Sequence, residues 1–184
     1  MTRETATPWD IRSRGVASLR PFYPSTHHVF RSWQMLGFFA TIIDMNLELI
    51  TLTGTQLDQP VYEVVLPTVE GEIGVFPGHE PLVAVAVPGA ISVRYDKSDS
   101  DSKLDYFAIS GGVIEITGES VRVLVDEADH GEDIIEAESK AALDRAIAMR
   151  DNAKNQVELE KAHQLVDRHA VRLKVAGLRR RHRS

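Results

Sequence analysis

Residues 121–149 have the sequence VRVLVDEADHGEDIIEAESKAALDRAIAM, and the spacing of their apolar side chains changes part way along. Val121, Val123 and Val125 share one face opposite Arg122, the period of two that is typical of a half-buried strand. Beyond the acidic residues 126–133, apolar residues recur every seven positions instead, as in an amphipathic helix. The stretch therefore predicts that a β-domain gives way to a helical domain near residue 130.

Earlier parts of the chain show the same alternation. Leu47 and Leu49 alternate with Asn46 and Glu48, and a second such run is Ile91-Ser92-Val93-Arg94-Tyr95. Gly- and Pro-containing turns occur near residues 54, 77–78, 88–89, 111–112 and 118–120, and the polar residues 96–103 suit an exposed hairpin loop. Short strands with such regular turns predict a β-sandwich over residues 45–130.

Two helices are predicted over residues 131–184. Asp133, with Glu136 three residues on, forms a capping-box pattern for the start of the first helix, and Asp151-Asn152 offers a break before the second. The expected contact stripes are Ile135, Ala142 and Met149 with Ile134, Ala141 and Ala148 in the first helix, and Leu159, Ala162, Val166 and Leu173 in the second. The predicted fold class is therefore α+β, an N-terminal β-sandwich followed by a C-terminal antiparallel two-helix hairpin. Its Ala-rich stripes bury little area, so we expect the hairpin to be weakly held.

The composition and the missing motifs argue against several classes of function. The 184 residues carry a formal net charge of −6, with 43% hydrophobic and 26% charged residues, as in a soluble globular protein. This acidic balance argues against nucleic-acid binding. The chain contains no Cys, no phosphate-cradling Walker loop, no dinucleotide-binding glycine pattern and no His-Glu-x-x-His zinc motif. We therefore predict no catalytic, cofactor-binding or metal-binding residues.

Residues 1–44 mix Arg, Pro, Ser and aromatic residues without sustained periodicity. We predict an extension that is disordered or that results from a start assigned too far upstream, with Met45 as the functional start. A transit peptide and a docking extension are the alternatives. The longest apolar run, residues 35–43, is shorter than the about 20 residues that a membrane-spanning helix needs.

Two charged clusters stand out. The acidic residues 126–133 lack the alternating ligand positions of a calcium loop, so we interpret them as a solvated linker between strand and helix. The basic residues 179–183, RRRHR, have three interpretations: a solvated helix end stabilised by the helix dipole, a contact with an anionic partner, or a nucleic-acid contact. Nucleic acid is the weakest of these because the rest of the chain is acidic.

The most specific motif is GEIGVFPGHEPL at residues 71–82, whose Gly and Pro residues suit tight turns and close packing. This motif resembles the hallmark Gly-Glu-x-Gly-x-x-Pro-Gly-His-x-Pro-Leu of the epsilon subunits of F-type ATP synthases. The resemblance continues through GGVIEI at residues 111–116 and VRVLVDEA at residues 121–128 into the predicted helices. It covers residues 45–184 in order.

The resemblance implies a non-catalytic central-stalk subunit of a proton-translocating ATP synthase, which couples rotation of the c-ring and gamma subunit to ATP synthesis. The sandwich would dock on gamma and the c-ring. The helices would reach the alpha/beta catalytic head and inhibit ATP hydrolysis. Such a subunit is peripheral to the membrane and does not span it; we expect the cytoplasmic side of a bacterial cell membrane, with an organellar inner membrane as the alternative.

The resemblance also implies roles for particular residues. It places Glu72 in a loop that meets the c-ring and His79 in the neighbouring contact region. The alternatives are an ordinary surface carboxylate for Glu72 and a turn residue for His79. The basic residues expected to meet acidic segments of the beta subunits are Arg168, Arg172, Lys174, Arg179, Arg180 and Arg181.

One departure from the family concerns nucleotide. Some bacterial members bind regulatory ATP through a Leu/Ile-Asp-x-x-Arg-Ala motif at the start of the first helix. Here Ile135 stands in place of the Asp and Glu138 in place of the Arg. Because Glu138 would repel a polyphosphate, we predict no ATP binding through this motif and an unchanged melting temperature in millimolar ATP.

Two other classes of protein fit the bare pattern of strands then helices. A β-sandwich binding module with a coiled-coil tail would form a stable homo-oligomer and have no affinity for gamma. A hydrolase is the weaker alternative, because the sequence offers only scattered carboxylates and histidines.

Overall fold

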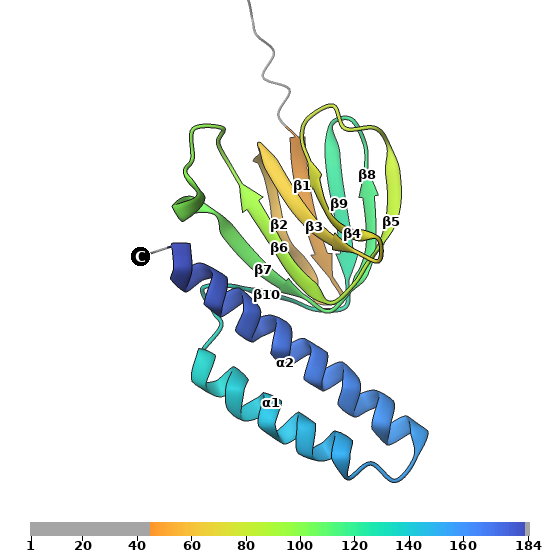
Figure 1. Cartoon of the computed structure of the whole chain (residues 1–184). Helices are drawn as coiled ribbons and strands as arrows, with labels where there is room; N and C mark the ends of the chain where they lie inside the picture. The colour runs from red at the N-terminus through yellow and green to blue at the C-terminus, as the bar shows by residue number, and fades with distance from the viewer. Residues whose placement is uncertain (1–44, 183–184) are drawn as a thin grey trace, which may run out of the picture. The chain divides into compact units, whose positions relative to one another are not determined.

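The computed structural model describes residues 45–182, in which strands come first and helices follow (Figure 1). The strands are β1 (Met45–Thr51), β2 (Gly54–Val61), β3 (Glu63–Thr68), β4 (Gly71–Val75), β5 (Leu82–Ala86), β6 (Gly89–Arg94), β7 (Asp105–Ile109), β8 (Gly112–Ile116), β9 (Ser120–Val125) and β10 (Ala128–His130). A short 3-10 helix, η1 (Asp101–Lys103), lies between β6 and β7, inside the hairpin loop that the sequence predicts. The helices are α1 (Glu136–Asp151) and α2 (Gln156–His182). The predicted extension, residues 1–44, lies outside the described residues.

The strands form one sheet in the order β10-β7-β6-β3-β5-β8-β9-β1-β2, with β4 paired to β3. Only Thr68 and Ala86 pair between β3 and β5, so the sheet folds over at that junction and closes on a shared core. The β1–β9 pairing is parallel, and β1–β2 and β8–β9 on either side of it are antiparallel. This is the β-sandwich that the sequence predicts.

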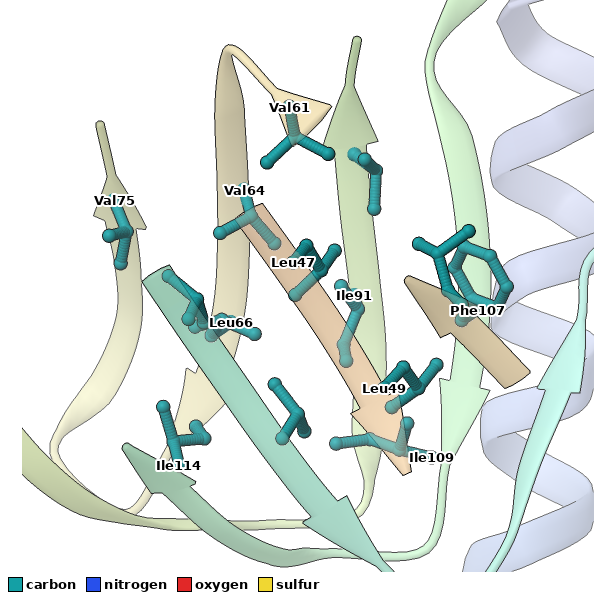
Figure 2. Packing of buried hydrophobic residues seen from close by; sticks show 14 of the residues in the cluster. Leu47, Leu49, Val61, Val64, Leu66, Val75, Ile91, Phe107, Ile109 and Ile114 are labelled. Carbon is teal, nitrogen blue, oxygen red and sulfur yellow. The ribbon is translucent and has the colours of Figure 1, made fainter. Parts of the chain in front are cut away.

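Alternating side chains build the core. Buried positions alternate along β1 and β9, as the sequence indicates, so Leu47, Leu49 and Val123 point inward. Figure 2 shows such side chains from several strands gathered together, among them Leu66 and Ile91. Each fully buried Leu or Ile contributes roughly 1.5–3 kcal/mol relative to an exposed one, so this core carries most of the fold's stability.

The two helices form the predicted antiparallel hairpin, joined by residues 152–155. In Figure 1, α2 lies along the sandwich, on the side of β7 and β6, and α1 packs on α2. Asn155 caps α2: its Oδ1 accepts a hydrogen bond from the Glu158 amide at 2.9 Å, and Glu158 Oε2 accepts one from the Lys154 amide at 2.9 Å. No helix in the described part of the chain combines the length and apolar content needed to cross a membrane.

The predicted start of the first helix is wrong by a few residues. Asp133 does not cap a helix; its amide donates to the His130 carbonyl in a turn at 3.0 Å. Ile134 is instead buried against Tyr106 and Val175, and α1 begins only at Glu136 without a side-chain cap. Burial of Ile134 against the sandwich therefore fixes the chain here more strongly than the local capping pattern does.

The predicted stripe is also wrong for α1 but correct for α2. In α1 the buried residues are Ser139 and Ala146, whereas Ile135 and Met149 are both 55% exposed. In α2, Ala162 is buried, and Leu159, Val166 and Leu173 are partly buried beside it. Apart from Val175, the fully buried residues of the two helices are therefore small, Ser139, Ala146 and Ala162, and each buries little apolar area.

Residues 126–133 are not simply a solvated linker. Their centre forms β10, which pairs with β7 through Ala128 opposite Ile109 and His130 opposite Phe107. Strand pairing holds this acidic segment against the sheet, beside α2.

Candidate partner-binding surfaces

Several of the predicted basic residues of α2 lie beside acidic residues of the same chain. Arg168 Nη1 lies 2.8 Å from Glu127 Oε2, and Arg172 Nε lies 3.4 Å from Asp129 Oδ2. Arg179 lies 3.5 Å from Glu132 Oε1 and also donates to the Gly131 carbonyl at 3.0 Å. Arg180 pairs with Glu136 of α1 at 3.1 Å, whereas Arg181 is exposed. Four of the arginines predicted to meet a partner's acidic segments thus meet acidic residues of their own chain.

A polar cluster fixes the acidic segment in place. Asp105 of β7 lies at its centre: Tyr95 donates its hydroxyl to Oδ2 at 3.0 Å, and His130 Nε2 lies 2.8 Å from Oδ1. The His130 ring also packs on Phe107, with centroids 4.8 Å apart. Burial beside the Asp105 charge raises the pKa of Tyr95, so its hydroxyl stays protonated and keeps donating. β10 is therefore a rigid support for the carboxylates on either side.

Glu72 is not in a loop. It is the second residue of β4, directly after the turn that joins β3 to β4, and its side chain is 62% exposed. Its Oε1 lies 3.4 Å from Lys174 Nζ of α2. The structure therefore brings together two of the predicted partner-binding residues, one from the sandwich and one from the hairpin.

His79 is a half-exposed turn residue. Its amide donates to the Phe76 carbonyl at 3.1 Å, and its Nδ1 lies 2.7 Å from the Glu80 carbonyl oxygen, which can accept a hydrogen bond from the Nδ1-protonated ring. These bonds fit the turn-residue alternative, and they involve Nδ1 of the ring and not Nε2.

A cationic seam lies between the helices. Arg145 of α1 and His169 and Arg172 of α2 line a cavity of about 180 Å³, together with Glu138. His169 Nδ1, Arg172 Nε and Arg168 Nε are buried and have no hydrogen-bond partner among the described residues, and the first two belong to residues that line this cavity. Burial, followed by the charges of Arg168, Arg172 and Arg145, lowers the pKa of His169, although Asp129 opposes the shift.

An apolar row that was not predicted from the sequence lies on the outer face of the sheet. Val85, Val113 and Leu124 stand opposite one another on β5, β8 and β9, and they are 55%, 46% and 42% exposed. Ile50 of β1 continues the row beside Leu124. Four neighbouring apolar side chains on an exposed sheet face are typical of a surface that another protein covers.

A charged row runs beside the apolar row. Arg122 of β9 lies between two carboxylates, with Nε 2.9 Å from Glu48 Oε2 and Nη1 3.5 Å from Glu115 Oε2. Val83, which is 70% exposed, occupies the same row on β5 opposite Glu115. An apolar centre with a polar margin is the usual layout of a protein interface.

A signal for this row is present in the sequence. Residues 82–86, LVAVA, are apolar at every position, and Leu124 is apolar where its neighbour two residues earlier, Arg122, is charged. Strands that are apolar on both faces are typical of sheets covered on both sides. None of the described residues forms a group of three or more His, Asp or Glu side chains that could hold a metal.

Comparison with known proteins gives one consistent family. Residues 44–131 match the family model described as the ATP synthase delta/epsilon chain β-sandwich domain. The ATP synthase epsilon chain of Herpetosiphon aurantiacus is 36% identical over 137 residues, which are 74% of this chain and 96% of that protein. The epsilon chain of Staphylococcus aureus is 30% identical over 136 residues, 73% of this chain and 98% of that protein.

A solved structure shares the fold. A chain in the cryo-EM structure of the Euglena gracilis mitochondrial ATP synthase, OSCP/F1/c-ring in rotational state 1, is similar with a TM-score of 0.62. The similarity covers 87% of this chain and 99% of that chain at 24% sequence identity. The likeness therefore extends beyond the sandwich into the helical hairpin.

Proposed function

The chain belongs to the epsilon-chain family of ATP synthase subunits, and from this premise we propose that it is a non-catalytic central-stalk subunit that couples rotation of the c-ring and gamma subunit to ATP synthesis in a proton-translocating ATP synthase. The observation that carries the proposal is the exposed apolar row. Rotation can pass through this subunit only if it is fixed to the rotor, and a fixed contact requires buried apolar area. The row of Val85, Val113 and Leu124 supplies such area on a rigid sheet.

The gamma subunit is the proposed occupant of the apolar row, and the c-ring is the proposed partner of the turn regions around Glu72 and His79. Both residues follow Gly- or Pro-containing turns and are accessible on the sandwich. An exposed carboxylate and a turn histidine suit hydrogen bonds with polar loops. The subunit would then lie on the cytoplasmic side of a bacterial cell membrane, without spanning it.

Inhibition of ATP hydrolysis is assigned to the hairpin. The fully buried residues of α1 are Ser139 and Ala146, and those of α2 are Ala162 and Val175, of which Val175 contacts the sandwich cluster. A weakly packed element can be shifted between two positions by a few kcal/mol. Once released, the hairpin would bind acidic segments of the beta subunits in the catalytic head through the basic residues of α2. The proposed function needs no bound cofactor.

One experiment tests both parts of the proposal. Tagged protein beginning at Met45 is used to recover partners from the native membranes, and the purified enzyme is assayed for ATP hydrolysis with the full chain or with a chain ending at Asp133. We expect recovery of gamma with the alpha and beta subunits, and faster hydrolysis with the shortened chain. Recovery of the bait alone as a homo-oligomer would overturn the stalk assignment, and unchanged hydrolysis would overturn the inhibitory role.

A further inference from the structure

The two end strands of the sheet flank an open groove. Among the described residues β2 pairs only with β1 and β10 only with β7, so each stands at one end of the strand order. Between them lies a groove of about 430 Å³, and residues from both sides line it: Gln56, Leu57 and Gln59 of β2, with Phe107, Ala128 and His130 of β7 and β10. The sheet therefore leaves a seam open between its end strands.

One backbone edge of β2 points away from β1 and toward this groove. Pro60 has no N–H and cannot donate to β1, and Tyr62 donates its amide to the Arg94 carbonyl of β6 at 2.9 Å. Because backbone groups alternate between the two edges of a strand, Asp58 turns its N–H and carbonyl oxygen to the same outer edge. Arg94 leads directly to Tyr95, which lines the groove. The outer edge at Asp58 has no paired strand in the described structure, so another chain can bond to it.

Gln59 is a polar residue at an inward-facing position. It stands opposite Leu47 of β1, and directly opposed residues share one face of the sheet. Leu47 is buried in the core, as are Leu57 and Val61, which lie two positions to either side of Gln59. Gln59 itself is exposed. The inward face of β2 therefore reaches water at the groove, where no described residue covers it.

The groove is acidic. Three carboxylates line it, those of Asp105, Asp129 and Asp133, and none of the described residues that line it is Lys or Arg. Asp129 is partly balanced by Arg172, whose Nε lies 3.4 Å away. Asp105 accepts the hydroxyl of Tyr95, a neutral donor, and its side chain is 25% exposed. A partner of complementary charge would carry Lys or Arg.

We propose that the groove between β2 and β10 binds an extended basic segment of a partner protein, which adds a strand to the outer edge of β2 and places a Lys or Arg side chain beside Asp105. Bonds to the β2 backbone supply the affinity in this mode of recognition, and the side chains that enter the groove supply the selectivity. Because successive side chains of a strand alternate between two faces, every second residue of the segment faces the groove. The preferred segment therefore has Lys or Arg at alternate positions.

The test measures binding of the fluorescent peptide TKVKVKT to the full chain by anisotropy at low salt. We expect saturable binding to the wild type and roughly tenfold weaker binding to Gln59→Lys, because the added ammonium group would repel a lysine in the groove. Gln156→Lys is the matched control, since it makes the same change at an exposed site at the start of α2. It should bind the peptide like the wild type.

The role of Asp105 is tested with Asp105→Asn, which removes the carboxylate charge and keeps an oxygen that can accept the Tyr95 hydroxyl. We expect roughly tenfold weaker binding, because a charge-assisted contact is lost. Asp144→Asn removes the same charge from an exposed site on α1 and should leave binding unchanged. Gln59 is exposed, so its substitution tests the groove even where Asp105→Asn lowers the melting temperature.

Backbone pairing is tested with the wild-type chain and two N-methylated peptides. One carries methyl groups on the amides of two lysines and the other on the amides of both valines, and these amides point to opposite edges of an extended chain. Because only one edge can pair with β2, we expect one peptide to lose binding and the other to keep it. Equal effects of the two methylation patterns would overturn the inference.

Two further results would also contradict this binding mode. The first is equal affinity of the wild type and Gln59→Lys, and the second is the absence of saturable binding, whether or not the chain associates with itself. Neither gamma nor ATP hydrolysis enters these assays, so their outcome is independent of the proposed function.

Discussion

Gly112 stands at the start of β8, where the backbone leaves no room for a side chain. Its φ of +150° is a value that L-residues rarely adopt, and a Cβ at this position would lie 2.0 Å from the Leu124 carbonyl oxygen. We expect Gly112→Ala to lower the free energy of unfolding by about 3 kcal/mol, because strain and overlap add. The measurement is the urea midpoint of the full chain.

Gly118→Ala is the matched control for this prediction. Gly118 lies in the turn between β8 and β9, and a Cβ there would meet nothing within 4 Å. The urea midpoint of Gly118→Ala should correspond to a change of less than about 1 kcal/mol in the free energy of unfolding. Equal midpoints for the two variants would show that the backbone at Gly112 relaxes easily.

We expect His169 to make the stability of the hairpin depend on pH. In the folded chain its pKa is lowered by burial and by the charges of Arg168, Arg172 and Arg145, and Asp129 opposes this shift. Near pH 6 the unfolded chain therefore binds more protons than the folded chain. Stability from the neutral ring is therefore present above the unfolded pKa of about 6.5 and is lost as the pH falls toward the folded pKa. We expect the melting temperature of His169→Gln to fall less than that of the wild type between pH 7.5 and pH 5.5.

His163 provides the control on the same helix, because its side chain is exposed. His163→Gln should show the same pH dependence as the wild type. If His169→Gln does so too, the arginines around His169 do not disfavour its protonation.

At the scale of elements, Val175 joins the hairpin to the sandwich. It is fully buried against Tyr106, Ala108 and Ile134. It also packs closely on Gly131, because a Cβ added to that glycine would lie 3.2 Å from Val175 Cγ1. We expect Val175→Ala to lower the opening free energy of the hairpin by about 2 kcal/mol, because it leaves a cavity at the point of contact. Hydrogen exchange should then speed up in α2 while β1 keeps its protection.

Val157→Ala is the comparison, since Val157 is 61% exposed at the start of α2. It should leave exchange in α2 unchanged. Faster exchange throughout β1 as well as α2 in Val175→Ala would contradict the prediction, because it would mean that hairpin and sandwich open as one unit.

The elements differ in how far sequence predicts them. Strands such as β1 and β9 are evident because their inward residues are large and alternate mostly with polar ones. The contact stripe of α1 is hidden, because Ser139 and Ala146 are buried through position and not through hydrophobicity. The start of α1 depends on burial of Ile134 against residues far away in sequence, which no local capping pattern contains.

At the scale of the molecule, sequence motifs identify the family, but the surfaces require the fold. The basic residues of α2 and the acidic residues 126–133 are both conspicuous in the sequence, yet only β10 pairing brings Arg172 beside Asp129. The apolar row likewise depends on strand register, because Val85, Val113 and Leu124 come from three separate strands. Partner-binding surfaces of this kind are assembled from distant segments and therefore escape a linear motif.

The apolar row should respond to a buried charge if gamma docks on it. Val113 lies at its centre, between Val85 and Leu124, and is 46% exposed, so a glutamate there can reach water in the free subunit. Covered by a partner, the same carboxylate would lose its hydration without gaining a counter-charge. We expect Val113→Glu to reduce recovery of gamma at least about tenfold while leaving the melting temperature of the isolated chain unchanged.

The control for this substitution is Val157→Glu, which adds the same charge to an exposed site on the hairpin. It should recover gamma like the wild type, because the hairpin lies outside the proposed contact. If both variants recover gamma normally, the apolar row is not the docking surface, and the rotor contact must be sought on another face of the sandwich. If both fail, net charge and not the row governs recovery. Only loss confined to Val113→Glu supports attachment to the rotor through β5, β8 and β9.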